Sequence, residues 1–231
     1  MKSYISTIIS ILEKLKPQTI LDIPSGEGVL LRELTFDVEI DGVDLYELKP
    51  EGYRGFHQFD MDNGLPKDLP LYDAIVSCEG LEHLGNPLLF LENIKSHLNS
   101  KGVLIISTPN IWPPSSKLKF LMRGFFPSFP NLAGKIIKGS HMHIMPWSYP
   151  SLYLFLKLAG FDEIRLHSIK EKKPKHLFER FFGWPQTIYC NKNARDAVSS
   201  EIREYWADAG SPQSVYGRHL VVSAIYNKQA K

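Results

Sequence analysis

Short apolar segments alternate with amphipathic segments along most of the chain. Isoleucine and leucine recur at helical spacing between residues 5 and 15, and Pro17 ends that pattern, so we predict an amphipathic helix there. Short runs rich in apolar residues and bounded by turn residues or acids are typical of buried strands. Such runs predict strands at 19–23, 38–43, 55–59, 72–78, 102–107, 161–169 and 220–226.

Helical segments separate many of these predicted strands. The pattern predicts helices at 29–34, 87–98 and 149–159, the last of them capped by Gly160. Strands that alternate with helices favour a mostly parallel sheet that is covered by helices on both faces. We therefore predict an α/β fold with a seven-stranded, mostly parallel sheet, formed by a single domain that spans residues 1–231.

Two tracts interrupt this alternation. Residues 110–147 follow the fifth predicted strand and are rich in proline, glycine, phenylalanine and basic residues. A tract of this length in a compact domain is usually functional, so we predict a lid or substrate insertion that would shape an acceptor pocket and exclude water. Residues 171–218 form a second insertion that is partly irregular and partly helical, with a helix around 201–206.

Aromatic residues gather in both insertions. Those of the first are Trp112, Phe120, Phe125, Phe126, Phe129 and Trp147. They can line an acceptor lid, stack on a nucleobase, contact a membrane near a lipid-linked substrate, or pack on the sheet. Those of the second are Phe178, Phe181, Phe182 and Trp184. Their helical spacing fits core packing as well as a pocket extension or a dimer contact.

Composition and charge exclude several classes of protein. Hydrophobic residues make up 43% of the 231 residues and charged residues 23%, as in ordinary globular proteins. The net charge of +2 by itself gives no argument for a nucleic-acid or membrane partner, although residues 117–138 contain bases and no acid. Two cysteines exclude a disulfide framework or a cysteine zinc cluster. With no cleavable signal and no apolar run long enough to span a bilayer, we expect a cytoplasmic protein.

Acids stand at the ends of three successive predicted strands. Asp22 opens the turn 22–28, whose Gly26 and Gly28 allow a close backbone approach to a ligand at the carboxyl edge of the sheet. Asp44 ends the second strand, where a carboxylate can accept hydrogen bonds from a ribose. Asp60 and Met61 follow the third strand, where they can meet an adenine. Each feature alone fits a turn or a solvated loop, but together they favour a nucleotide-like cofactor.

Six segments, in this order, resemble the class I S-adenosylmethionine-dependent methyltransferases over residues 18–170. They read ILDIPSGEG, VDLYE, HQFDMDNGLP, YDAIVSCEGLEHLGNP, GVLIISTPN and HMHIMPWSYPSLYLFLKLAGF. The resemblance implies a Rossmann-like fold and S-adenosylmethionine as cofactor. The cofactor-binding residues it implies are Asp22, Pro24, Ser25, Gly26, Gly28, Asp44, Leu45, Asp60, Met61 and Cys78.

Two positions depart from related patterns. Pro24 stands where the family commonly has glycine, which removes a backbone N–H and fixes φ, so a backbone contact is lost or the turn is stiffened. Leu31 stands where a dinucleotide-binding turn would place its third glycine, which disfavours an NAD-dependent enzyme.

Carboxylates and imidazoles cluster in two further segments. Glu79, Glu82 and His83 follow the fourth strand, and His141 and His143 precede Trp147 and Ser148. Mixed carboxylate and imidazole ligands suit Mg, Mn, Fe or Zn. This combination resembles small-RNA 2′-O-methyltransferases and, more loosely, ubiquinone-pathway O-methyltransferases.

That narrower resemblance assigns roles at the reaction centre. It implies that Glu79, Glu82, His83 and His143 bind a divalent cation such as Mg or Mn. His143 is preferred to His141 because it lies five residues before Ser148. The alternative is a role without metal, in which His83 or His143 acts as the catalytic base or binds substrate, or His83 caps the next helix.

The leading functional prediction is methyl transfer to an oxygen of a small-molecule, glycan-like or lipid-linked acceptor, with peripheral membrane contact left open. An RNA 2′-O-methyltransferase is the alternative, against which the modest net charge and the lack of a recognisable RNA-binding module count. An inactive methyltransferase-like binding subunit is a third reading, and the intact acids and glycines argue against it. The sequence does not indicate the oligomeric state.

Overall fold

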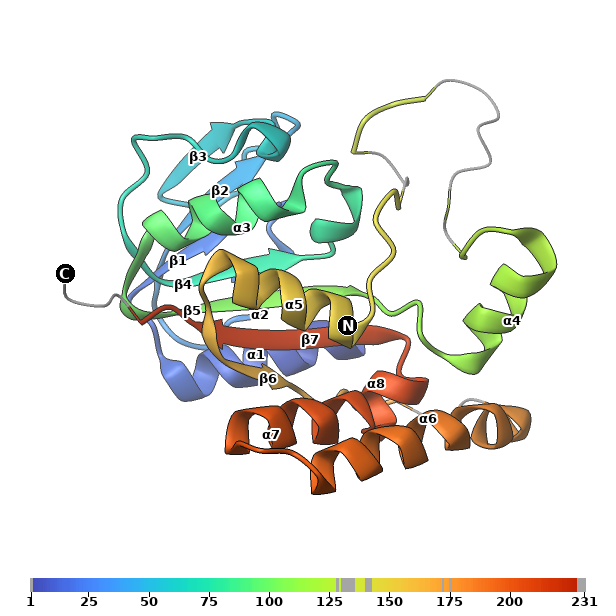
Figure 1. Cartoon of the computed structure of the whole chain (residues 1–231). Coiled ribbons are helices and arrows are strands. Elements are labelled where there is room, and N and C mark those ends of the chain that lie inside the picture. Colours follow the sequence, from blue (N-terminus) through green and yellow to red (C-terminus); the bar gives the residue numbers. More distant parts are fainter. Residues whose placement is uncertain are drawn as a thin grey trace.

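A computed structural model describes residues 2–127, 129, 136–139, 143–171, 173–174 and 176–227. Its centre is a seven-stranded sheet in the order β3-β2-β1-β4-β5-β7-β6 (Figure 1), in which β7 alone runs antiparallel to its neighbours. The strands are β1 Thr19–Asp22, β2 Glu39–Asp44, β3 Gly55–Gln58, β4 Tyr72–Cys78, β5 Leu98–Pro109, β6 Asp162–Leu166 and β7 His219–Ile225. The predicted α/β, mostly parallel, seven-stranded fold is therefore confirmed.

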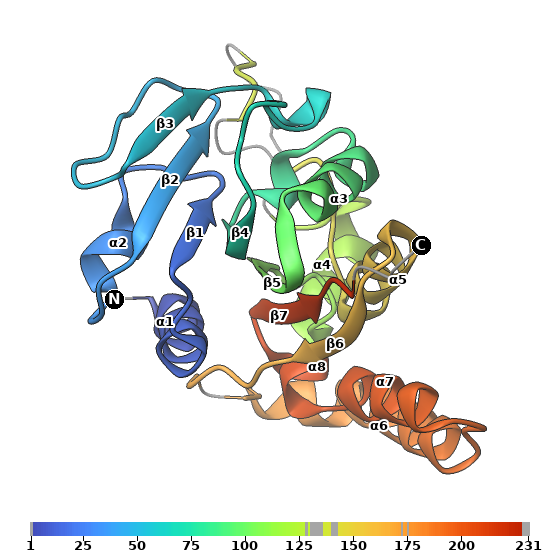
Figure 2. The same cartoon turned by 90° about the vertical axis from the view of Figure 1, so that its left-hand side faces the viewer.

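Helices cover both faces of this sheet. They are α1 Ser3–Leu15, α2 Val29–Glu33, α3 Pro87–Ser96, α4 Pro114–Arg123, α5 Tyr149–Ala159, α6 Leu177–Arg195, α7 Ser200–Ala209 and α8 Pro212–Tyr216, with short 3-10 turns η1 Met61–Asn63 and η2 Leu81–His83. Figure 2 shows α1 and α2 on one face, α3 and α5 on the other, and α6 and α7 beyond the β6 edge. Among the described helices, none is both long and apolar enough to cross a membrane.

Alternating residues of each central strand supply two separate cores. Leu21 and Leu104 face the layer of α3 and α5, whereas their neighbours Ile20 and Ile105 face α1 and α2. Successive side chains of a strand point to opposite faces of the sheet. Because helices cover both faces here, both sets of side chains are apolar, and each strand is a continuous apolar run in the sequence. The sheet is thus held from both sides, and its carboxyl edge is left to carry the polar loops.

The structure differs from the predictions mainly outside these central strands. The fifth strand is longer than predicted, 98–109, and the sixth is shorter, 162–166. The first insertion contains α4, which begins with Pro114 and ends at Gly124 in the left-handed conformation. Its large apolar residues lie outward, so the sequence lacks the core-facing periodicity that would have predicted a helix.

The aromatic cluster of α6 is exposed, and the core-packing interpretation of its spacing is wrong. Phe181, Phe182 and Trp184 are 74%, 61% and 62% exposed. The helix packs instead through its small residue Gly183, where an added Cβ would lie 2.3 Å from the Tyr216 ring. Because α8 packs so closely on the side of α6 that carries Gly183, that side has no room for large aromatic rings. The aromatic side chains of α6 therefore point away from α8.

Pro24 packs on the residue that follows Glu79. A Cβ added to Gly80 would lie 2.3 Å from Cδ of Pro24, although the φ of Gly80, −114°, suits any residue. The proline thus fills the space between the ends of β1 and β4, and Gly80 is required by contact rather than by backbone conformation.

We therefore predict that Gly80→Ala lowers the free energy of unfolding by about 2 kcal/mol, because the added methyl overpacks this contact. Urea denaturation measures the change. Pro24→Ala removes the ring atoms that cause the clash, so in that background Gly80→Ala should cost less than about 0.5 kcal/mol. Equal costs in the two backgrounds would show that Pro24 is not the constraint.

Candidate active site

A cavity of about 810 Å³ lies at the carboxyl edge of the sheet, where the ends of β1, β2, β3 and β4 converge. The predicted cofactor residues that line it are Asp22, Pro24, Ser25, Gly26, Asp44, Leu45, Asp60, Met61 and Cys78. Of the predicted set, only Gly28 is missing from the described residues that line this cavity. The structure therefore brings residues from four strand ends to one hollow.

Two glycines make room for the loop that contains Pro50 and Tyr53, behind the turn 22–28. A Cβ on Gly42 would lie 2.8 Å from the Tyr53 ring, and one on Gly28 would lie 2.6 Å from Cβ of Pro50. Gly28 also has a φ of +73°, which favours glycine. The Tyr53 hydroxyl donates to Oδ2 of Asp22 over 2.5 Å. Tyr53 was missed by the sequence analysis because it lies in a loop without a motif.

Asp22 is buried, and its environment shifts its titration. Burial raises the pKa of Asp22 to about 8, the hydrogen bond from Tyr53 opposes that rise, and the nearby Asp44 adds to it. At neutral pH the carboxyl group therefore favours its protonated form.

Asp44 ties the cofactor turn to the end of β2. Its Oδ2 accepts the Gly26 N–H at 2.9 Å, and its Oδ1 accepts the Tyr46 N–H at 3.0 Å. A carboxylate oxygen accepts more than one hydrogen bond, so Asp44 retains the capacity to bind ligand hydroxyls. Gly26 has a φ of +50°, and its Cα side is open, since a Cβ there would meet no described atom within 4 Å.

Part of the first insertion lies beside this cavity. Lys138 places Nζ 2.6 Å from Oδ2 of Asp60 and 2.7 Å from Oδ2 of Asp62. The Tyr46 hydroxyl donates to the carbonyl of Lys138 over 2.6 Å, and Lys138 and Gly139 line the cavity. Residues 136–139 thus bridge the loops after β2 and β3, as a lid would; the lid function itself remains a prediction.

Backbone hydrogen bonds bring His143 to η2. The N–H groups of Ile144 and Met145 donate to the carbonyl of Glu82 over 2.9 and 3.1 Å. The rings of His83 and His143 meet edge to face with centroids 5.0 Å apart. One ligand atom each from Glu82, His83 and His143 lie within 4.8 Å of one another. His141, the other histidine of that segment, lies outside the described residues.

Glu79 is not part of this group. It adopts a φ of +54°, which is uncommon for a residue with a side chain, and its N–H donates to the Ser107 carbonyl over 3.0 Å. Its carboxylate lies 3.4 Å from Oγ of Ser107 and 3.6 Å from Nε2 of His219. The structure thus gathers three of the four predicted metal ligands and turns the fourth toward β5 and β7.

Glu82 is buried, and the side chain of Glu79 is partly buried, with 24% exposed. Loss of solvent contact, and then the charge of Glu82, raise the pKa of Glu79, and burial raises the pKa of Glu82. Oε2 of Glu82 accepts a hydrogen bond from Oγ1 of Thr108 at 3.0 Å. Oε1 of Glu82 finds no hydrogen-bond partner within the described part of the chain, and Nε2 of His83 lies 4.0 Å away. A buried oxygen in this state is unusual and points to a ligand.

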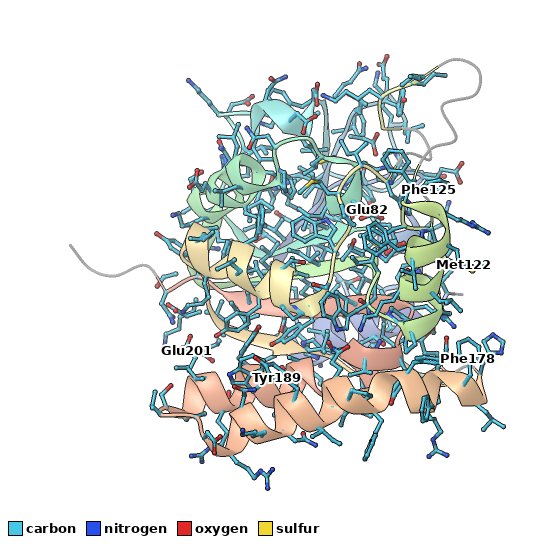
Figure 3. All side chains as sticks on the ribbon, turned by 45° about the vertical axis from the view of Figure 1, so that its right-hand side comes forward. Glu82, Met122, Phe125, Phe178, Tyr189 and Glu201 are labelled. Carbon is cyan, nitrogen blue, oxygen red and sulfur yellow. The ribbon has the colours of Figure 1, made fainter. Side chains whose placement is uncertain are left out.

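A second cavity of about 780 Å³ adjoins this cluster. Glu79, Glu82 and His143 line its polar part. Its apolar part is lined by Phe120, Phe125, Phe126 and Phe129. The rings of Phe120 and Phe126 are stacked, with their centroids 4.3 Å apart. In Figure 3, Glu82 lies farther inside the molecule than Phe125. This cavity therefore offers a polar inner end and an aromatic wall.

Arg218 and His219 also line the second cavity and were missed by the sequence analysis. They lie where the antiparallel strand β7 begins, and β7 returns them next to Pro109 and the end of β5. Arg218 donates to Oγ of Ser115 over 2.5 Å and to the buried Glu179 over 2.6 Å. A strand order that places β7 beside β5 is invisible to local patterns, so no signal in the sequence pointed to them.

The two cavities adjoin at Glu79, Glu82, His83 and His143, which we call the reaction cluster. Glu79 lines both, His83 lines the first and His143 lines the second. Two carboxyl groups and two imidazoles therefore lie where the two cavities adjoin. Such a site can position an acceptor, take its proton and stabilise charge.

Comparisons with known proteins agree with this arrangement. A family model described as a methyltransferase domain matches residues 2–166. No curated protein sequence matches the chain significantly.

Solved structures share the fold at low identity. The methyltransferase domain of a bacterial Hen1, CtHen1, has a TM-score of 0.53 at 18% identity, covering 96% of this chain and 97% of that one. A putative methyltransferase in complex with the Haloferax volcanii Trm112 activator scores 0.54 at 15% identity, with 93% and 84% covered. Human N-acetylserotonin methyltransferase in complex with its S-adenosylmethionine scores 0.56 at 12% identity, with 97% and 52% covered. The chain belongs to the methyltransferase-domain family, among the class I S-adenosylmethionine-dependent methyltransferases.

Proposed function

We propose that the protein transfers the methyl group of S-adenosylmethionine to an oxygen of a small-molecule, glycan-like or lipid-linked acceptor, with the help of a divalent cation. The observation that carries this proposal is the meeting of two cavities at Glu79, with Glu82, His83 and His143 beside the junction. The first cavity would hold the methyl donor and the second would hold the acceptor.

The positions of the acids support one orientation of the donor. Asp44 would bind the ribose hydroxyls, and Asp60 with Met61 would contact the adenine. Asp22 and the open backbone at Gly26 would face the amino-acid end, because the ammonium group of that end complements a buried carboxylate. The sulfonium would then lie toward Glu79, at the junction of the cavities.

The chemical step displaces the thioether. The acceptor oxygen forms a bond to the methyl carbon while the carbon–sulfur bond breaks, and the proton of the acceptor hydroxyl passes to a base. In the alternative without a cation, His143 would be the base on the acceptor side and His83 the base on the donor side, because an imidazole bound to a cation has no lone pair left to accept a proton. Holding the two reactants in line in adjacent cavities supplies much of the acceleration.

The residues at the junction fit a divalent cation. Glu82, His83 and His143 offer a carboxylate and two imidazoles, and Oε1 of Glu82, to which no described residue donates a hydrogen bond, is the kind of atom a cation would satisfy. When bound, the cation would lower the pKa of an acceptor hydroxyl. Glu79 is assigned to the wall of the junction rather than to the ligand set, since its carboxylate lies against Ser107 and His219.

Removal of a ligand tests the metal site. We expect Glu82→Gln and His143→Ala each to weaken Mn²⁺ binding by about tenfold or more, because each removes one of three protein ligands. Calorimetric titration with Mn²⁺ in the presence of S-adenosylhomocysteine measures this. His57→Ala, on β3, is the matched control and should bind Mn²⁺ like the unaltered protein. Absence of Mn²⁺ binding in the unaltered protein, with activity that EDTA leaves intact, would refute the metal assignment.

The pH dependence of cofactor binding tests the role of Asp22. Because the pKa of Asp22 is raised to about 8, the free protein holds this carboxyl protonated at neutral pH. An ammonium group favours the ionised form, so the affinity for S-adenosylhomocysteine should rise about tenfold from about pH 6 to about pH 8.5, with proton release on binding.

Calorimetry in buffers of different ionisation heat measures both effects. Asp22→Asn should flatten the pH profile and abolish the proton release, whereas Asp68→Asn, an exposed acid on another loop, should change neither. An unaltered profile in Asp22→Asn would show that Asp22 does not face the ammonium group.

A further inference from the structure

Helix α4 and the first half of α6 lie side by side at one end of the molecule. They are in contact, and Nζ of Lys117 on α4 donates to Oε1 of Gln186 on α6 over 2.7 Å. Figure 3 shows Met122 and Phe125, from α4 and its end, and Phe178 of α6 along the same side, away from the sheet. We refer to the outward side of residues 114–125 and 177–184 as the α4–α6 face.

The α4–α6 face exposes an unusual amount of apolar surface. Its most exposed side chains are Leu121 81%, Met122 77%, Leu177 84%, Phe181 74%, Phe182 61% and Trp184 62%. Single exposed apolar residues are ordinary, but many exposed leucine, methionine and aromatic side chains on two helices in contact indicate a surface for another apolar phase or partner.

The charges on this face are of one sign. Lys119, Arg123 and Arg180 are exposed on it. The only acid in 114–127 and 177–195 is Glu179, which is buried and accepts a hydrogen bond from Arg218. Exposed bases among leucine, phenylalanine and tryptophan are the features of helices that lie in the interface of an anionic bilayer, where apolar side chains enter the acyl boundary and bases meet headgroups.

The second cavity continues onto the same face. Phe120, Phe125 and Phe129 line that cavity, yet each is exposed to between 42% and 43%. An apolar wall therefore runs from the reaction cluster to the surface. A molecule anchored in a bilayer could place its polar head in the cavity while its apolar portion stays on this wall.

We propose that the α4–α6 face binds the surface of an anionic lipid bilayer, and that the acceptor is a lipid-linked molecule drawn from it. The polar head of the acceptor reaches Glu82 and His143, and its apolar portion passes along Phe120 and Phe125. The bilayer contact is inferred only from the exposed residues of the α4–α6 face, whereas the assignment of the acceptor also rests on the proposed function.

Vesicle sedimentation tests the bilayer contact directly. The full chain should bind vesicles of equal parts phosphatidylcholine and phosphatidylglycerol about tenfold or more tightly than vesicles of pure phosphatidylcholine. Leu121→Glu combined with Phe181→Glu should weaken binding to the mixed vesicles by about tenfold or more. The matched control is Leu154→Glu combined with Leu158→Glu, at exposed leucines of α5, which should bind as the unaltered chain does.

The basic residues have their own test. Lys119→Ala combined with Arg123→Ala should remove most of the preference for phosphatidylglycerol, because each base near a charged bilayer contributes separately. Calorimetric titration with S-adenosylhomocysteine on every variant shows whether the fold and the donor site are intact.

Several results would overturn the proposal. It fails if the unaltered chain does not sediment with mixed vesicles, if it binds pure phosphatidylcholine equally well, or if the Leu121 and Phe181 variant binds undiminished. It also fails if ultracentrifugation shows a dimer that these two substitutions dissociate, since the face would then be covered by a second copy. Vesicle binding that fails while S-adenosylhomocysteine still binds contradicts the membrane proposal only. Loss of S-adenosylhomocysteine binding in the unaltered chain contradicts the proposed function.

Discussion

The hydrogen bond from Tyr53 to Asp22 is the interaction on which the first cavity depends. Asp22 ends β1 in a buried position, where a carboxyl group without a partner is costly. Tyr53 reaches it only because Gly42 has no side chain in the path of the ring. Through this bond the loop after β2 is fixed against the end of β1, and Asp44 can hold the turn at Gly26. The shape of the first cavity follows from these contacts.

The first insertion supplies the other half of the site. The insertion leaves the sheet at Asn110 and returns next to that residue at Trp147, because the Ile111 N–H donates to the Trp147 carbonyl over 2.9 Å. On the way back it pairs with Glu82 and delivers His143 to η2. Because both ends of the insertion are anchored at the end of β5, its contents can vary without disturbing the sheet, and acceptor selectivity is expected to reside there. The donor site, by contrast, is built from the strand ends themselves.

Sequence patterns were sufficient for the central sheet and for most of the residues that line the first cavity. Buried parallel strands read as apolar runs, and the acids that end them mark one edge of the sheet, so Asp22, Asp44 and Asp60 could be placed together in advance. Tyr53 and His219 could not, since their approach depends on loop paths and on strand order rather than on local periodicity. Glu79 shows another limit of sequence patterns, because its φ is left-handed and its carboxylate lies against Ser107 and His219, outside the group formed by Glu82, His83 and His143. The exposed aromatics of α6 were equally ambiguous, for helical spacing is the same whether a face meets a core or the solvent.

The central claim is that the donor lies in the first cavity with its reactive sulfur at the junction with the second. A crystal structure with S-adenosylhomocysteine tests this claim most directly. We expect density with the ribose at Asp44, the adenine at Asp60 and Met61, and the sulfur beside Glu79, facing His143. Density that places the ligand in the second cavity, or that turns the sulfur away from the junction, would contradict it.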